Sequence, residues 1–403
     1  MECDIKSIKT KESIIFNSIS HCLEEGESIV FDRTFDFQLP QGSKKLKWPP
    51  KTYVEVKYRL IYDSLFQISN SFNKIEGNKL IVIVVTEQSN IPKLNDKITN
   101  RNIDVESYDE FVSSLPILNA EKADSLNAIY IKAKDENVFF KAKEAIKNNK
   151  ISLFLGAGVS ASAGIPTWGN LLEQLCVKKG LSKLDSDIDS IIKGRFIIDE
   201  YEQQKEKMQN ELNDDMNSIL YANIHSSSLI KAIADVVVKS NVESIISYNY
   251  DDLVEQEIRK KENAKCRSIY DKSRQAKGTD IPVYHVHGLI SQNGVNSPIV
   301  LGEKEYHKIY QEAYNWSNVE QLHSLCRNVC FFIGLSMNDP NLRRIMDISI
   351  DDSEFELVHF AFLRKIEYDI PFMEKIMSGF GVNCIWYDNY EDLPKLLRKL
   401  IQE

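Results

Sequence analysis

The feature that most constrains the fold is an apolar run that leads directly into closely spaced glycines. The run Ile-Ser-Leu-Phe-Leu occupies residues 151–155, and Gly156-Ala-Gly158-Val-Ser160 follows it. An apolar run before a glycine turn is typical of a buried strand that passes into a helix. Glycines let a diphosphate approach the backbone, and the N–H groups at the start of the helix attract it. The pattern therefore predicts a dinucleotide site in an α/β domain.

The spacing of these glycines differs from the dehydrogenase fingerprint. The next glycine after Gly158 is Gly164, which is too late for G-x-G-x-x-G. No acidic strand end follows at the usual offset of about 20 residues to hold a ribose. The sequence therefore disfavours a hydride-transfer enzyme. A sharp strand-to-helix turn with no phosphate bound to it is the alternative reading of the glycines.

Length and composition set the broad class of the protein. The 403 residues are enough for two domains. A formal net charge of −9 argues against a generally basic nucleic-acid binder, although a local basic patch stays open. The seven cysteines include no C-x-x-C pair, so we expect neither a disulfide framework nor a cysteine zinc site. With no basic-then-apolar leader and no apolar run of about 20 residues, we expect a cytoplasmic protein with no membrane span.

The predicted elements indicate two domains, residues 1–135 and 136–403, with the junction just before a helix at 136–146. Strands alternate with helical segments in the second domain, which predicts a doubly wound parallel sheet. A helical insertion at 171–240 contains a highly charged segment, 199–208, which is either a solvated helix face or an oligomer contact. The predicted strands of the second domain are 151–155, 244–247, 283–287, 329–333, 356–362 and 384–387.

Polar residues stand at the ends of several of these strands. Asn249 and Asp251 follow the strand at 244–247, and His287 precedes a glycine at the end of the next strand. Gly334 and Ser336 follow the strand at 329–333. Because doubly wound sheets bind ligands at the carboxyl ends of their strands, we expect these groups to gather at one site.

This order of motifs resembles the sirtuin superfamily, and more closely its prokaryotic sirtuin-like branch that hydrolyses NAD⁺ in antiphage defence. The resemblance covers the chain from residue 151 to the end and implies a sirtuin-like Rossmann domain. It implies that the G-A-G-x-S and G-I-P stretches hold NAD⁺ and that the late G-x-S lies near the adenosine ribose. A tryptophan after G-I-P would cap the nicotinamide pocket or serve as a core aromatic. The implied NAD⁺-binding residues are Gly156, Ala157, Gly158, Ser160, Gly164, Ile165, Pro166, Trp168, Gly334 and Ser336.

The resemblance also assigns catalytic residues. Breaking the bond between nicotinamide and ribose passes through an oxocarbenium-like state, which needs a positioned nucleophile. Asn249 would orient a water or a ribose hydroxyl, and His287 would accept a proton at cytosolic pH. Asp251 would support the developing positive charge, or it would cap a helix. Strand alternation predicts that His285 lies on the same face as His287 and supports it.

The chain departs from protein-deacylating sirtuins in one respect. Those enzymes carry a zinc module built on two C-x-x-C pairs, whereas Cys326 and Cys330 have no second pair. We therefore expect no zinc, and we expect water as the acceptor, which makes the activity that of an NAD⁺ glycohydrolase. Two alternatives stay open: a module that senses NAD⁺ or a nucleotide and controls an N-terminal nuclease, and an NAD⁺-dependent protein deacylase.

The first domain has a motif of its own. Asp36 lies in a predicted strand at 35–39, and Glu55-x-Lys57 lies in another at 53–58. This arrangement resembles the PD-(D/E)xK restriction-endonuclease-like superfamily and implies an α/β nuclease-like domain. Asp36 and Glu55 would then hold Mg²⁺ while Lys57 helps a water attack a phosphodiester. Glu24 or Glu25 would add a further metal ligand.

The expected partners follow from these functions. Uncontrolled NAD⁺ loss would kill the host, so we expect a restrained resting state, maintained by a homo-oligomer or by a partner. The resemblance suggests a HerA-type ATPase as that partner. The lysine-rich loop at 44–48 would contact nucleic acid, or it is a solvated turn.

Overall fold

The computed structural model describes residues 4–402 apart from 33, 58–59, 61, 86–90, 92–99, 117–119, 183–186, 203–207, 263, 274–277, 279, 313 and 351–357. The chain divides into two compact units, Met1–Lys141 and Ala142–Glu403. The division falls within one long helix, α5 (Ala120–Asn148), which also contains the predicted junction at 135/136. None of the described helices is both long and apolar enough to cross a membrane.

The N-terminal unit is built on a mixed five-stranded sheet in the order β1-β2-β3-β4-β5. The first three strands run antiparallel, and β3, β4 and β5 run parallel. The predicted strands at 35–39 and 53–58 correspond to β2 and β3, although Tyr58 lies outside the described residues. The strands are β1 (Val30–Phe31), β2 (Phe37–Leu39), β3 (Thr52–Lys57), β4 (Lys79–Val84) and β5 (Ile103–Ser107).

Side-chain alternation along β3 separates the two faces of this sheet. Val54 and Val56 pack with Phe16 of α1 (Asp4–Cys22) and Phe111 of α4 (Tyr108–Ser113). Tyr53 packs on the opposite face with residues of α2 (Tyr62–Asn73). Because side chains alternate along a strand, Glu55 and Lys57 lie on the Tyr53 face.

The C-terminal unit contains a seven-stranded sheet in the order β12-β11-β10-β6-β7-β9-β8, and its strand pairs are parallel. The predicted α/β fold with a parallel sheet is therefore confirmed for this unit. Its strands are β6 (Ile151–Leu155), β7 (Val242–Ser247), β8 (Cys266–Ile269), β9 (Ile281–His285), β10 (Val329–Ile333), β11 (His359–Arg364) and β12 (Val382–Tyr387).

The strand predictions for this unit were wrong at several strands, and β7, β9 and β12 each begin two residues before the predicted start. The short edge strand β8 was missed because its polar residues, Arg267 and Ser268, give no apolar run. Strand β9 ends at His285, earlier than the predicted 287. Strand β11 extends to Arg364, past the predicted end, and the predicted residues 356–357 lie outside the described ones.

The order of the strands fixes where a ligand site forms. From central β6 the chain builds β7, β8 and β9 on one side of the sheet and then β10, β11 and β12 on the other. The direction of winding therefore reverses between β6 and β10, which are adjacent strands. Loops leaving two such strands diverge at their carboxyl ends, and the gap between them is where open α/β sheets bind ligands.

Apolar residues cover both faces of the sheet, as expected for buried parallel strands. Phe154 of β6 and Phe332 of β10 lie with their ring centroids 4.9 Å apart, in a core shared with α13, α14 and α15. On the opposite face Phe331 and Phe360 stack at 5.3 Å. The helices named here are α13 (Trp316–Arg327), α14 (Pro340–Ser349) and α15 (Ile370–Gly379).

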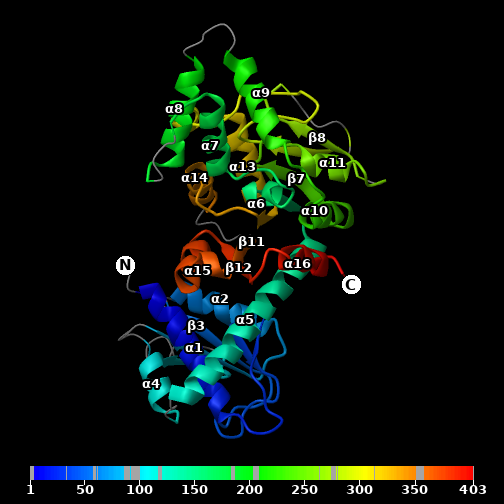
Figure 1. The fold of residues 1–403 in the computed structure, drawn as a ribbon. Coiled ribbons are helices and arrows are strands. Elements are labelled where there is room, and N and C mark those ends of the chain that lie inside the picture. The colour runs from blue at the N-terminus through cyan, green and yellow to red at the C-terminus, as the bar shows by residue number, and fades with distance from the viewer. Residues whose placement is uncertain are drawn as a thin grey trace. The chain divides into compact units, whose positions relative to one another are not determined.

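The predicted helical insertion at 171–240 is present. Helices α7, α8 and α9 pack against one another (Figure 1). The charged segment 199–208 is divided between the end of α8 and the start of α9, and 203–207 lie outside the described residues. The insertion comprises α7 (Trp168–Lys178), α8 (Ser190–Glu202), α9 (Met208–Leu220) and α10 (Ser228–Lys239).

Gly194 is the point at which α8 meets the chain before α12 (Glu303–Gln311). A Cβ at this position would lie 2.1 Å from the carbonyl oxygen of Leu301. Gly194→Ala should therefore lower the free energy of unfolding by about 2 kcal/mol through overpacking. Gly169→Ala in α7 is the matched control, because nothing lies within 4 Å of its Cβ. The control should be neutral or slightly stabilising. Denaturant midpoints measure both variants, and equal midpoints would contradict the contact.

Candidate functional site

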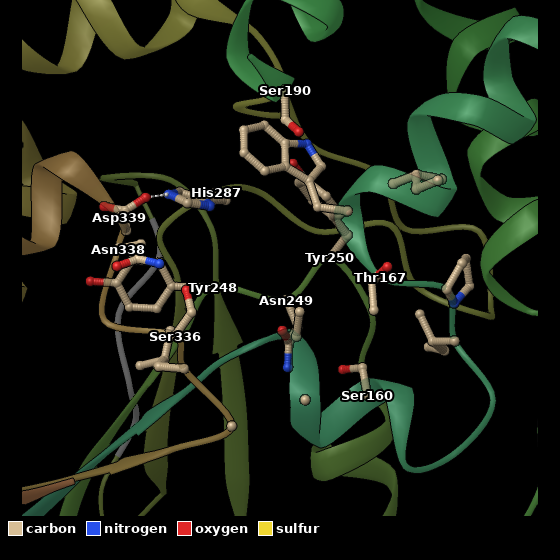
Figure 2. A pocket seen from close by; sticks show the side chains of 18 of the residues that line it. Ser160, Thr167, Ser190, Tyr248, Asn249, Tyr250, His287, Ser336, Asn338 and Asp339 are labelled. Atoms are coloured by element: carbon tan, nitrogen blue, oxygen red, sulfur yellow. Dashed lines mark ion pairs between the residues drawn. The ribbon is translucent and has the colours of Figure 1, made fainter. Parts of the chain in front are cut away.

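A cavity of about 610 Å³ opens at the carboxyl ends of the strands of the C-terminal unit. Its wall combines the loops that follow β6, β7, β9, β10, β11 and β12 with residues of the helical insertion. Asn249 and His287, which come from separate loops, border the same space (Figure 2). The site therefore forms where the strand order predicts a ligand crevice.

The glycine turn after β6 is joined to the loop after β10. The N–H of Gly156 donates to the Ile333 carbonyl at 3.0 Å, and the N–H of Gly158 donates to the Gly334 carbonyl at 2.9 Å. A Cβ at Gly156 would lie 2.5 Å from the Gly334 oxygen. The expectation that this turn leaves its N–H groups free for a diphosphate is therefore wrong for these two groups. They connect two loops, and the glycines allow the close approach.

Most residues predicted to hold NAD⁺ line the cavity. Gly156 and Gly164 do not. Gly164 has a φ of +93°, and a Cβ there would lie 2.2 Å from the Asn223 carbonyl oxygen, so this glycine shapes the turn that precedes Ile165. The predicted residues found in the cavity wall are Ala157, Gly158, Ser160, Ile165, Pro166, Trp168, Gly334 and Ser336.

The Ser160 hydroxyl and the Asp251 carboxylate, both in cavity-lining residues, interact with each other, and the hydroxyl lowers the pKa of Asp251. Nε1 of Trp168 is buried and has no hydrogen-bond partner among the described residues. Buried polar groups in folded proteins are nearly always paired, so this N–H in the cavity wall indicates a place for a polar ligand. Trp168 therefore offers a donor here, in addition to its aromatic surface.

Asp251 is a buried carboxylate in the cavity wall whose pKa is shifted. Burial raises its pKa to about 6, and the nearby Ser160 hydroxyl and Leu253 N–H offset that rise only in part. Its Oδ1 accepts from the N–H of Leu253, the first residue of α11 (Leu253–Ile258), at 3.2 Å. The carboxylate thus caps a helix start and also interacts with the Ser160 hydroxyl of the turn after β6.

His287 is held between aromatic rings and one carboxylate. The rings of Tyr248 and Tyr306 meet it edge-on, with centroids at 5.0 Å and 5.6 Å. Its Nε2 lies 3.7 Å from Oδ2 of Asp339 (Figure 2). Burial lowers the pKa of His287 below its ordinary value, although Asp339 opposes the shift. The imidazole is therefore neutral near pH 7, the state that accepts a proton.

The role of Asp339 was missed from the sequence. Its Oδ2 also accepts the hydroxyl of Tyr306 at 2.8 Å, and its Oδ1 accepts the N–H of Leu342 at 2.8 Å, at the start of α14. The carboxylate is thereby fixed at a helix start next to His287. The sequence signal that could have identified it is its place in Asn338-Asp339-Pro340, just after the predicted strand at 329–333. The sequence does not show that His287 would be its neighbour.

Asn249 is only 7% exposed, and it lines the cavity. Its N–H donates to the Ser247 hydroxyl at 3.2 Å, and its carbonyl oxygen lies 3.1 Å from Nδ1 of His285. The expectation that His285 and His287 share a face is wrong, because β9 ends at His285 and alternation does not continue to His287. His287 lines the cavity, whereas His285 lies behind it.

An aromatic part of the cavity wall was not predicted. Tyr387 at the end of β12, with Tyr368 and Tyr390 from the loops after β11 and β12, lines it together with Arg364 at the end of β11. The guanidinium of Arg364 lies 4.3 Å from the centroid of the Tyr390 ring. A planar base fits this chemistry, because bases stack on aromatic rings and on guanidinium planes. The tyrosines after the last two predicted strands were the missed signal.

The N-terminal unit brings together the residues of its predicted site. Oδ2 of Asp36 accepts the N–H of Val56 at 2.6 Å, and the N–H of Asp36 donates to Oε2 of Glu55 at 3.1 Å. Nζ of Lys57 lies 2.6 Å from Oε1 of Glu55. Burial raises the pKa of Glu55 to about 7, and Asp36 adds to the rise. Burial and Glu12 likewise raise the pKa of Asp36.

The carboxylate whose charge acts on Asp36, besides the groups of its own cluster, is Glu12 of α1, whereas Glu24 lies 3.8 Å from Lys44. The expectation of Glu24 or Glu25 as a further metal ligand stays a prediction. Glu12 itself accepts the hydroxyl of Tyr130 at 3.1 Å. In the described part of the chain, no group of three or more His, Cys, Asp or Glu side chains is placed to hold a metal ion.

Comparison with known proteins places the C-terminal unit. Residues 243–385 match the family model of the SIR2-like domain. A protein from Enterococcus faecium named NAD(+) hydrolase ThsA is 25% identical over 291 residues, which cover 66% of this chain and 58% of that protein. A protein of the same name from Acinetobacter baumannii (strain 532279) is 22% identical over 272 residues, covering 63% and 54%. The chain thus matches less than two-thirds of the length of these relatives.

A solved structure from work on the mechanism and regulation of Sir2 enzymes aligns with 66% of this chain and 98% of that one. Its sequence identity is 14% and its TM-score is 0.33, which is too low to support a shared fold. The family match over residues 243–385 confirms the sirtuin-like resemblance of the C-terminal unit, and the names of the relatives agree with it.

Glu55 gives a prediction about stability. Because its pKa is raised to about 7 in the folded unit, the folded unit binds protons more tightly than the unfolded chain. The N-terminal unit should therefore gain stability, on the order of 2 kcal/mol, as the pH falls from about 8 to about 5. Glu55→Gln should raise its stability at the higher pH and flatten this dependence. Denaturant midpoints at the two pH values measure both effects.

Glu76→Gln is the matched control, because the side chain of Glu76 is 94% exposed. It should leave the pH dependence unchanged. Loss of stability in Glu55→Gln at the higher pH would show that the ion pair with Lys57 outweighs burial, contrary to this expectation.

Proposed function

We propose that the C-terminal unit hydrolyses NAD⁺ to ADP-ribose and nicotinamide. The observation that carries the proposal is the meeting of Asn249 and His287 in one cavity, whose wall also contains the unpaired N–H of Trp168. The names of the relatives support it, because both are NAD(+) hydrolases. The cavity volume of about 610 Å³ also lies within the range of cofactor sites.

The proposed reaction breaks the bond between C1′ of the ribose and the nicotinamide nitrogen. The bonding electron pair leaves with the nicotinamide, which becomes neutral, and positive charge develops on the ribose. A water oxygen then bonds to C1′, and His287 accepts the proton that the water loses. The Asn249 amide orients that water or a ribose hydroxyl. The Asp251 carboxylate, ionised above about pH 6, supports the developing charge.

Asp339 completes this arrangement. A neutral base needs its ring held in one orientation, and its charged form needs a nearby carboxylate once the proton arrives. Oδ2 of Asp339, 3.7 Å from Nε2 of His287, supplies that carboxylate, while the rings of Tyr248 and Tyr306 pack against the imidazole. Asp339 is itself fixed by Tyr306 and by the start of α14. We therefore assign Asp339 as the group that stabilises the charged form of the base.

At the other end of the cavity, we propose that the adenine base lies against the tyrosines and Arg364. The turn at residues 157–160 and the loop at Gly334–Ser336 would then lie along the phosphates and ribose between the two ends. In this assignment Trp168 caps the nicotinamide. The resemblance to antiphage proteins suggests a resting state restrained by a homo-oligomer or by a HerA-type ATPase partner, with NAD⁺ loss after infection.

The hydrolysis proposal is tested by separate Asn249→Ala and His287→Ala variants. Each should lower the rate of NAD⁺ hydrolysis by about 100-fold or more, because each removes a group that acts on the reacting atoms. Chromatography of ADP-ribose and nicotinamide measures the rate, and circular dichroism checks folding. His323→Ala, at an exposed position on α13, is the matched control and should keep full activity.

The outcome of this assay also separates the alternatives. If NAD⁺ persists with the wild-type protein under activating conditions, a sensing module that controls the N-terminal unit replaces hydrolysis. If O-acyl-ADP-ribose forms from an acyl-lysine peptide, a deacylase replaces it.

A second activity is favoured by the cluster of Asp36, Glu55 and Lys57. We propose that this cluster is a metal-dependent nuclease site, as the PD-(D/E)xK resemblance suggests. Both carboxylates have raised pKa values, so the folded site favours an added positive charge. Asp36 and Glu55 would hold Mg²⁺, a metal that prefers carboxylate oxygens. Lys57, 2.6 Å from Glu55, lies where it would assist an attacking water.

Lys57→Ala tests the nuclease proposal. In the presence of Mg²⁺ or Mn²⁺ the wild-type protein should cleave DNA or RNA, and the variant should cleave at least about 100-fold more slowly. Gel electrophoresis of labelled substrates measures cleavage. Lys74→Ala, at an exposed position after α2, is the matched control. Equal cleavage by the Lys57→Ala and wild-type proteins would remove the proposed role.

A further inference from the structure

Behind the cavity wall lies a buried ion pair that touches the loop carrying Asn249. We propose that His285, paired with Glu255, positions Asn249 for reaction by holding its main-chain carbonyl. The proposal rests on NAD⁺ hydrolysis at this site. It concerns a positioning residue, because His285 does not line the cavity and would not touch substrate.

The geometry joins three secondary-structure elements to one loop. Nδ1 of His285, the last residue of β9, lies 3.1 Å from the Asn249 carbonyl oxygen. Its Nε2 lies 2.6 Å from Oε1 of Glu255 in α11. The same carboxylate oxygen accepts the hydroxyl of Ser268 in β8 at 2.7 Å. The side chains of His285 and Glu255 are 0% and 1% exposed, so water does not compete for these bonds.

Both ring nitrogens of His285 face acceptors, which decides its protonation. A carbonyl oxygen and a carboxylate oxygen both require a hydrogen on the nitrogen that faces them. The ring is therefore an imidazolium that donates in two directions. Burial opposes this charge, but the Glu255 carboxylate and its hydrogen bond outweigh burial and raise the pKa of His285. The other charged group that faces the ring is Asp251, from the loop after β7.

This contact has a direct consequence for the reacting group. In the loop after β7, the N–H of Asn249 donates to the Ser247 hydroxyl. His285 fixes the carbonyl of the same residue, so both main-chain polar groups of Asn249 are held. The side chain can then project into the cavity from a defined position. Displacement of a positioned group by about 1 Å can reduce a rate by about 100-fold.

A second buried histidine of this sheet, His359, makes a structural contact away from the cavity. His359, in β11, is 4% exposed, and its Nδ1 accepts the N–H of Cys330 at 3.1 Å. Burial lowers its pKa to about 4, so it stays neutral. It does not line the cavity. Its loss should cost stability without changing the position of Asn249, which makes it the matched control.

The test compares His285→Leu, His285→Asn and His359→Leu by steady-state NAD⁺ hydrolysis. The assay temperature is kept below the thermal unfolding midpoint of each variant. His285→Leu should lower kcat by about 100-fold with KM within about threefold, because the substrate-contacting groups remain but Asn249 is displaced. His285→Asn keeps a donor where Nδ1 lies and should stay within about tenfold of wild type. His359→Leu should lose stability but keep kcat.

A kcat in His285→Leu within about threefold of wild type, or an equal fall in His359→Leu, would overturn the proposal. If His285→Leu does not fold, the comparison of His285→Asn with His285→Gln decides it. Glutamine moves the donor away from the Asn249 carbonyl, so only the asparagine should retain activity, and equal activity would overturn the proposal.

A second readout is independent of activity. Nitrogen NMR of histidine-labelled protein should show one ring protonated on both nitrogens at about pH 8, and this signal should be absent from His285→Asn. A His285 ring without hydrogen on Nδ1 would overturn the proposal even in an active enzyme. Absence of NAD⁺ hydrolysis by the wild-type protein with the NMR signal present would instead count against the proposed function.

Discussion

The site depends on the close contact between the turn after β6 and the loop after β10. Gly158 donates to the carbonyl of Gly334, and a Cβ on Gly334 would lie 2.7 Å from the amide nitrogen of Val159. These loops leave adjacent strands on the two sides of the reversal in winding, so joining them closes one wall of the cavity. Ser160 and Asp339 project from the segments that follow. The glycines are therefore needed first for loop packing, and ligand contact follows from the wall that this packing creates.

Buried charge is the second property shared by the functional regions. Burial raises the pKa of Asp251, and His287 stays neutral because burial lowers its pKa. His285 and Glu255 form a fully buried ion pair that a hydrophobic pair could replace in a protein without this function. Groups of this kind cost folding free energy, and they cluster at functional sites. Their concentration around one cavity is the physical reason to assign chemistry to it.

Much of this arrangement could be read from the sequence, and the remainder has a physical explanation. Apolar runs between glycines predicted the parallel sheet, and polar residues at strand ends predicted that Asn249 and His287 would lie close together. The short polar strand β8 was missed because an edge strand needs little apolar sequence. The partners Asp339 and Glu255 could not be identified, because side-chain distances between loops depend on packing that periodicity does not encode.

The central claim is that Asn249 and His287 act on one sugar carbon of a bound nucleotide. A crystal structure of the His287→Ala protein soaked with NAD⁺ tests it most directly. The account predicts electron density for C1′ of the nicotinamide ribose beside the Asn249 amide and facing the space left by the imidazole, with adenine at the tyrosine end of the cavity. Density for NAD⁺ with its nicotinamide ribose at the tyrosine end, or outside the cavity, would contradict it.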